Sequence, residues 1–196
     1  MCGFLFPIVL LLFYMLAISF SPHFDFTENW FSDLGGIIPS STLYIRPQAT
    51  TPFVALIYNI GLVISGILGL VFAYGLRKSI LVPSGRLGAL FFSFGSLSLL
   101  SAGIIPISFG IFHSIICKSF FVLMPLSILF IGITILNSHQ RLLGYFTIIL
   151  GLGSLLFGDV LIIYRAMSEV IALFSLTVFN IIYAMKIWKR NSLFSK

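Results

Sequence analysis

The chain has 196 residues, of which 59% are hydrophobic and only 8% are charged. Soluble domains carry about 25% charged residues, which help to cover their surface, so this composition excludes a soluble globular enzyme and a disordered tail. The formal net charge of +6 comes from cations that are spread along the chain rather than clustered on one segment. We therefore predict no nucleic-acid partner.

Six stretches are apolar and long enough to cross a bilayer, for which about 20 residues are needed. The first stretch lacks a positively charged n-region and is longer than the apolar part of a usual signal peptide, so we interpret it as a span. The expected fold is an all-α polytopic membrane protein, one domain over residues 1–196, with six transmembrane helices in one bundle and a long first loop at 21–52. The spans are expected at about 3–20, 53–76, 87–108, 114–136, 142–164 and 167–188.

The first loop is expected to contain a short helix on the membrane surface. Asp25 or Thr27 fits the N-cap of such a helix, and Gly35-Gly36 fits its end, so the helix would run from about Phe26 to Leu34. Its aromatic side chains would lie at the level of the lipid headgroups. We expect this loop to fold over the outer end of the bundle as a lid.

The second span carries a stripe of small residues at four-residue spacing, Gly61, Ser65 and Gly69. Residues four apart share one face of a helix, and small residues there let another helix approach closely. Packing within the bundle is the favoured interpretation of this stripe. Contact with a helix of a partner membrane protein is the alternative.

The distribution of cations predicts how the chain crosses the membrane. Cytoplasmic loops are enriched in Lys and Arg, so we predict a multi-pass protein of the cell membrane with both termini in the cytoplasm. Eight cations then lie on the cytoplasmic side: Arg77, Lys78, Arg86, Arg141, Lys186, Lys189, Arg190 and Lys196. Three lie on the other side: Arg46, Lys118 and Arg165.

This orientation places all five carboxylates at the extracytoplasmic face, together with two of the three histidines. The carboxylates are Asp25, Glu28, Asp33, Asp159 and Glu169, and the histidines are His23 and His113. A carboxylate within a span is costly and normally faces the bundle interior or water, which makes Asp159 a functional candidate. An ion pair of Asp159 with Arg165 or Lys118 is the structural alternative.

Metal binding and thiol chemistry have little support in the sequence. A divalent metal held by His23 and His113 is conceivable, but no His-Glu-x-x-His motif supports it, and we predict no metal ligands. Cys2 and Cys117 fall on opposite sides of the membrane, so they cannot form a disulfide, and no Cys-x-x-Cys motif is present.

Several short motifs together carry a family resemblance. They are Ser32-Asp33-Leu34-Gly35, an Asn…Gly pattern at 58–66, the stretch 103–106 followed by His113, and Glu169 after the fifth span. Their order and spacing resemble the small six-span prokaryotic membrane proteins catalogued as domain of unknown function nine hundred and ninety-eight. This resemblance covers nearly the whole chain and implies no activity.

A more distant similarity is to membrane proteins that remodel lipid anchors or hydrolyse lipid amides with a Ser, an Asp and several His around zinc. That similarity would make Ser32, Asp33, His113 and His23 partial matches, although the His-x-x-x-His pair of those proteins is absent.

The sequence indicates two functions of different classes, and a third with less support. The first is binding or chemistry on a membrane lipid, as a hydrolase or lipid-remodelling enzyme, at the extracytoplasmic polar site. Its candidate catalytic residues are His113, Asp33, Asp159 and Glu169, and its candidate substrate-binding residues are Arg165, Ser32 and His23. The second is a non-catalytic accessory or structural subunit that binds a partner through Gly61, Ser65 and Gly69. Binding or transport of a small hydrophobic molecule is the third.

Overall fold

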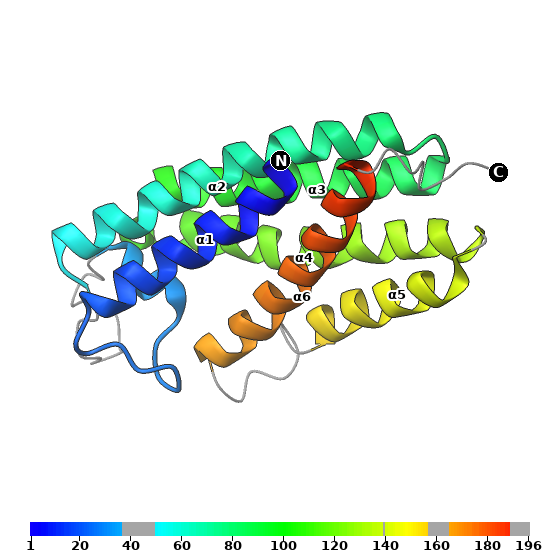
Figure 1. The fold of residues 1–196 in the computed structure, drawn as a ribbon. Coiled ribbons are helices and arrows are strands. Elements are labelled where there is room, and N and C mark those ends of the chain that lie inside the picture. Colours follow the sequence, from blue (N-terminus) through cyan, green and yellow to red (C-terminus); the bar gives the residue numbers. More distant parts are fainter. Residues whose placement is uncertain (37–49, 139, 157–164, 189–196) are drawn as a thin grey trace.

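The chain forms an all-α helical bundle, which Figure 1 shows in a computed structural model. The structure describes residues 1–36, 50–138, 140–156 and 165–188, with side chains from 168 onward in the last of these segments. The α-helices are α1 (Cys2–Ser19), α2 (Pro52–Ser79), α3 (Pro83–Ile104), α4 (Ile111–Leu136), α5 (Arg141–Leu155) and α6 (Arg165–Trp188). Two 3₁₀ helices connect them, η1 (Phe31–Gly35) and η2 (Ile107–Phe109).

Five of these helices contain an apolar segment long enough to span a bilayer: α1, α2, α3, α4 and residues Ser168–Trp188 of α6. The described part of α5 has 15 residues and is a shorter apolar helix. A polytopic membrane bundle was the fold class predicted from the apolar stretches, and the helices confirm it.

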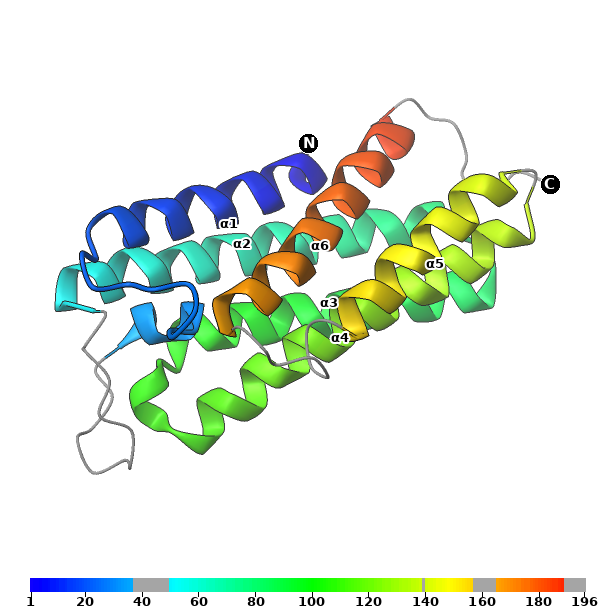
Figure 2. The same ribbon diagram turned by 90° about the horizontal axis from the view of Figure 1, so that it is seen from below.

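The helices pack as antiparallel neighbours. Figures 1 and 2 show α2, α3 and α4 running along the bundle, with α5 returning beside α4, and α6 crossing between α1 and α5. The C-terminal ends of α1 and α3 and the N-terminal ends of α2, α4 and α6 meet at one end of the bundle. We call this the lidded end, because η1 lies there beside the first turns of α6 (Figure 2).

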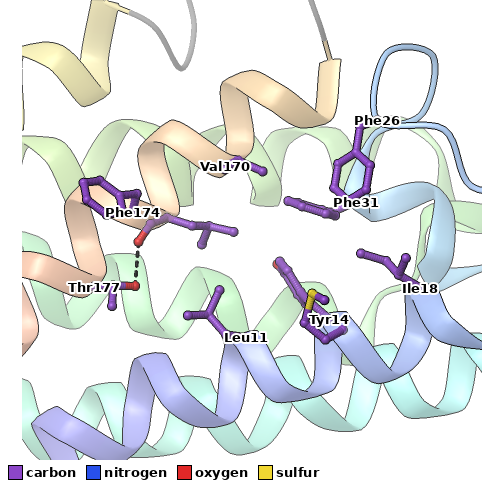
Figure 3. Close-up of a pocket in the computed structure, with 10 residues that line it drawn as sticks. Leu11, Tyr14, Ile18, Phe26, Phe31, Val170, Phe174 and Thr177 are labelled. Carbon is purple, nitrogen blue, oxygen red and sulfur yellow. Dashed lines mark hydrogen bonds between the residues drawn. The ribbon is translucent and has the colours of Figure 1, made fainter.

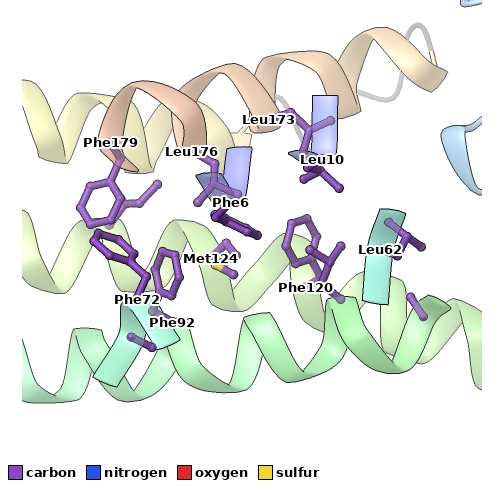
Figure 4. Packing of buried hydrophobic residues seen from close by; sticks show 14 of the residues in the cluster. Phe6, Leu10, Leu62, Phe72, Phe92, Phe120, Met124, Leu173, Leu176 and Phe179 are labelled. Carbon is purple, nitrogen blue, oxygen red and sulfur yellow. The ribbon is translucent and has the colours of Figure 1, made fainter. Parts of the chain in front are cut away.

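Aromatic side chains fill the centre of the bundle (Figure 4). Phe92 of α3 is fully buried, and its ring contacts Phe6 of α1, Phe72 of α2 and Phe179 of α6 at centroid separations of 5.9, 5.5 and 6.2 Å. Aromatic pairs at such separations add attraction beyond simple area burial. This matters in a bilayer, where helix association depends on close packing because lipid tails are themselves apolar.

The small-residue stripe of α2 is used inside the chain. A methyl group at Gly61 would overlap Phe13 of α1, and one at Gly69 would overlap Ser96 of α3. Ser65, which lies between them, is fully buried. The stripe therefore brings α1 and α3 close to α2, as the packing interpretation expects. Binding of a partner protein through it stays a prediction, and the face it needs is occupied by the chain's own helices.

Candidate functional site

The lid, residues 31–35, is a 3₁₀ helix whose start is fixed by its own polar groups. The Asp33 carboxylate accepts a hydrogen bond from the Trp30 amide at 2.9 Å and one from the Asn29 side chain at 3.4 Å. Side-chain acceptors of this kind satisfy the amides that the first turn of a helix leaves without a partner. Phe31 and Leu34 of the lid are buried against the bundle.

The short helix predicted from about Phe26 to Leu34 is wrong in its extent, since the helical part begins only at Phe31. Asp25 accepts hydrogen bonds from the hydroxyl and amide of Thr27, at 2.6 and 2.7 Å, and Trp30 is extended. Such local bonds offer the backbone an alternative to a helix. The Thr27 hydroxyl, and then its amide, hold the pKa of the exposed Asp25 carboxyl below its usual value.

Within the part of the chain that the structure describes, hydrogen bonds to side chains outside the lid fasten it in place. Glu169 of α6 accepts from the Phe31 amide at 2.7 Å, and the Asn59 side chain of α2 donates to the Gly35 carbonyl at 2.8 Å. The Thr50 hydroxyl donates to the Leu34 carbonyl at 2.7 Å. The lid carbonyls and amide would otherwise be buried without partners, at a cost of about 1–3 kcal/mol each. These side chains thus hold the lid on its underlying helices.

His113 lies beneath the lidded end, in the first turn of α4, and only 2% of its surface is exposed. Its Nδ1 bonds to the carbonyl of Ile105, which directly follows α3, and its Nε2 lies 3.2 Å from the thiol of Cys117. The chain can return to Ile105 because Gly110, just before α4, has a φ of 58°, a conformation that favours glycine. Both ring nitrogens therefore have partners other than a carboxylate.

A small cavity of about 20 Å³ lies between the lid and the helices. This volume exceeds the roughly 10–15 Å³ that one water molecule requires, but it is far below the volume of a lipid headgroup site. Apolar side chains such as Leu62, Leu99 and Phe120 form much of the cavity wall, and we call it the polar cavity for the polar groups that share this wall. Its polar lining comes from five elements: Tyr14 of α1, Ser32 of the lid, Tyr58 of α2, Cys117 of α4 and Glu169 of α6. Hydroxyl, thiol and carboxyl groups thus face one space in an otherwise apolar bundle.

A larger apolar groove of about 330 Å³ lies on the other side of Tyr14 (Figure 3). Leu11 and Met15 of α1 form one wall, Val170 and Phe174 of α6 form the other, and Phe31 of the lid closes one end. The hydroxyl of Thr177 in α6 donates to its own helix at Leu173, so it presents no open polar group. Tyr14 lines both the groove and the polar cavity.

The candidate residues from the sequence are only partly brought together. Ser32 and Glu169 line the polar cavity. His113 is hydrogen-bonded to Cys117, which also lines it. Asp33 is buried within the lid as its cap, whereas His23 is exposed on the loop after α1. Asp159 lies outside the described residues, and so does the side chain of Arg165, although its backbone begins α6.

The metal alternative at His23 and His113 gains no geometric support. Among the residues that the structure describes, no three His, Cys, Asp or Glu side chains are grouped as metal ligands. His113 uses its Nδ1 on Ile105 and its Nε2 on Cys117.

Among the described residues, sequence reasoning missed five of the site: Tyr14, Thr50, Tyr58, Asn59 and Cys117. The spacing of His113 and Cys117, four residues apart in a span, was an available signal for a pair on one helix face. Tyr14 and Tyr58 stack at a centroid separation of 5.1 Å. They come from different spans, so no local pattern in the sequence joins them.

Comparison with known proteins gives a family match. A family model described as "Protein of unknown function (DUF998)" matches residues 4–188. No curated protein and no solved structure matches the chain.

Proposed function

Because the chain belongs to the DUF998 family, whose description assigns no activity, we propose a function from the geometry of the site: the protein binds the acyl chain of a membrane lipid. The observation that carries this proposal is the groove of about 330 Å³ between α1 and α6. Ligand sites in proteins occupy about 300–1,000 Å³ and are lined mainly by apolar side chains. An acyl chain is the ligand that such a groove meets in a bilayer.

The position of the groove supports a lipid with its polar end at the lidded end. The groove lies between two helices that are apolar and long enough to span a membrane, α1 and α6. Phe26 and Phe31 of the first loop close it on the side of the lid. An acyl chain in the groove would run beneath these rings, with the polar part of the lipid near Tyr14. Tyr14 also lines the polar cavity, together with Tyr58 and Glu169.

Photo-crosslinking tests the proposal in the full-length protein reconstituted in vesicles. The probe is a phosphatidylethanolamine that carries a diazirine in one acyl chain. Mapping the crosslinked peptides by mass spectrometry is expected to show enrichment at Leu11, Met15 and Phe174 over other lipid-facing positions. Val170→Trp would fill the groove with a large ring and is expected to reduce this labelling several-fold.

Val71→Trp is the matched control, because Val71 is also an exposed valine, on α2 and away from the groove. It is expected to leave labelling of the groove unchanged. Even labelling of all lipid-facing helices, with no difference between the two variants, would show that the groove holds no particular chain.

A further inference from the structure

The pair formed by His113 and Cys117 has the geometry of an activated nucleophile. A carbonyl oxygen can only accept a hydrogen bond, so the Nδ1 that faces Ile105 carries the proton of the neutral imidazole. The lone pair is then on Nε2, 3.2 Å from the Cys117 sulfur, and the thiol donates to it. A nucleophile bonded to a base that a third group orients is the usual arrangement of covalent catalysis.

The sulfur also lines the cavity beneath the lid, although Cys117 is partly buried. Because this cavity of about 20 Å³ has room for one water, it must widen before an ester carbonyl can reach the sulfur. Across the cavity it faces Ser32, Tyr14, Tyr58 and Glu169. Tyr14 separates this cavity from the apolar groove and lines both.

We propose that Cys117 is a nucleophile that accepts the acyl group of a lipid ester, with His113 as its general base. His113 Nε2 takes the thiol proton while the sulfur bonds to the acyl carbonyl carbon. The carbon–oxygen bond of the ester then breaks, and the leaving alcohol oxygen takes the proton from Nε2. The products are the acyl thioester of Cys117 and the free alcohol, so atoms and charge balance.

The cavity also offers groups for two other parts of this reaction, stabilisation of the oxyanion and hydrolysis of the thioester. The hydroxyls of Tyr14 and Tyr58 hydrogen-bond to each other, which leaves one of the two as the donor for the oxyanion that forms on the carbonyl oxygen. The cavity volume of about 20 Å³ admits one water, which can hydrolyse the thioester as His113 takes its proton and returns it to the sulfur. The inference rests on the proposed acyl-chain function for its substrate class, but its test below does not use the groove.

The test uses the full-length protein in detergent with p-nitrophenyl octanoate as the probe. Intact and peptide mass spectrometry is expected to find an octanoyl group on Cys117, and none there in Cys117→Ala. Because a general base contributes at least about 100-fold to such steps, His113→Gln is expected to slow formation of the adduct by about 100-fold or more. Pre-alkylation of the wild-type thiol with N-ethylmaleimide is expected to abolish it, which tests the thiol without any variant.

Cys2 provides the internal control, since it is also a free and partly buried cysteine but lies in the first turn of α1, far along the chain from Cys117. Its alkylation rate is expected to be the same in wild type and His113→Gln. Absence of an adduct on Cys117, or its formation at an equal rate without His113, would overturn the proposal. Groove labelling by the lipid probe could still succeed in that case, so the two failures are distinguishable.

Discussion

The role of Glu169 follows from the backbone amide that its carboxyl group binds. The sequence offered it as a catalytic candidate because ionisable groups in spans are rare and costly. In the structure its side chain is 7% exposed and accepts the amide of Phe31, 138 positions earlier in the chain. It therefore holds the lid, and its place in the lining of the polar cavity depends on that bond.

Replacing Glu169 should loosen the lid. Glu169→Ala removes the acceptor of the buried Phe31 amide and is expected to lower the free energy of unfolding by about 1–3 kcal/mol. Denaturant titration in detergent measures this loss, and hydrogen exchange at the Phe31 amide reports whether it is local. Glu169→Gln keeps an oxygen acceptor and is the matched control, with a smaller loss expected. Equal exchange at Phe31 in all three proteins would contradict this role.

At the scale of the elements, glycine sets how closely α2 and α3 approach. A methyl group added at Gly66 would lie 2.7 Å from the backbone nitrogen of Leu100 and 2.8 Å from its Cα. Backbone cannot rotate away as a side chain can, so the two helices would have to separate. Gly75, on the same helix, has nothing within 4 Å of such a methyl group.

These two glycines make a matched pair of substitutions. Gly66→Ala is expected to destabilise the protein by about 1–3 kcal/mol, because overpacking forces backbone shifts. Gly75→Ala is expected to be neutral or to stabilise it by up to about 1 kcal/mol, since alanine favours a helix over glycine. Thermal unfolding of both variants in the same detergent measures the difference. A similar destabilisation by both would mean that the α2–α3 contact does not depend on Gly66.

The helices could be predicted from the sequence, but the contacts that build the site could not. Helices such as α2 and α4 follow from runs of apolar residues, whose length is set by the bilayer, and the packing face of α2 follows from the spacing of Gly61, Ser65 and Gly69. The site depends instead on contacts between distant segments, such as Glu169 with Phe31. A single sequence has no local pattern for these contacts, so candidate residues could be placed at one face but not paired.

At the scale of the whole molecule, the distribution of charge separates the two ends of the bundle. The last turn of α2, the first turn of α3 and the start of α5 carry Arg77, Lys78, Arg86 and Arg141. The lidded end carries Asp33 and Glu169 together with the exposed Asp25. An excess of Lys and Arg favours the cytoplasmic side, so the lid is predicted to face away from the cytoplasm.

Labelling of intact cells tests this orientation. Single cysteines are introduced as His23→Cys beside the lid and as Leu81→Cys between α2 and α3, where Leu81 is 69% exposed, in a chain that also carries Cys2→Ser and Cys117→Ala. A maleimide that cannot cross membranes is expected to label the first variant in intact cells and the second only after permeabilisation. Both substitutions leave the cations in place, so they preserve the charge that sets the orientation. The reverse labelling pattern would place the lid in the cytoplasm, and any lipid whose polar end reaches Tyr14 would then come from the inner leaflet.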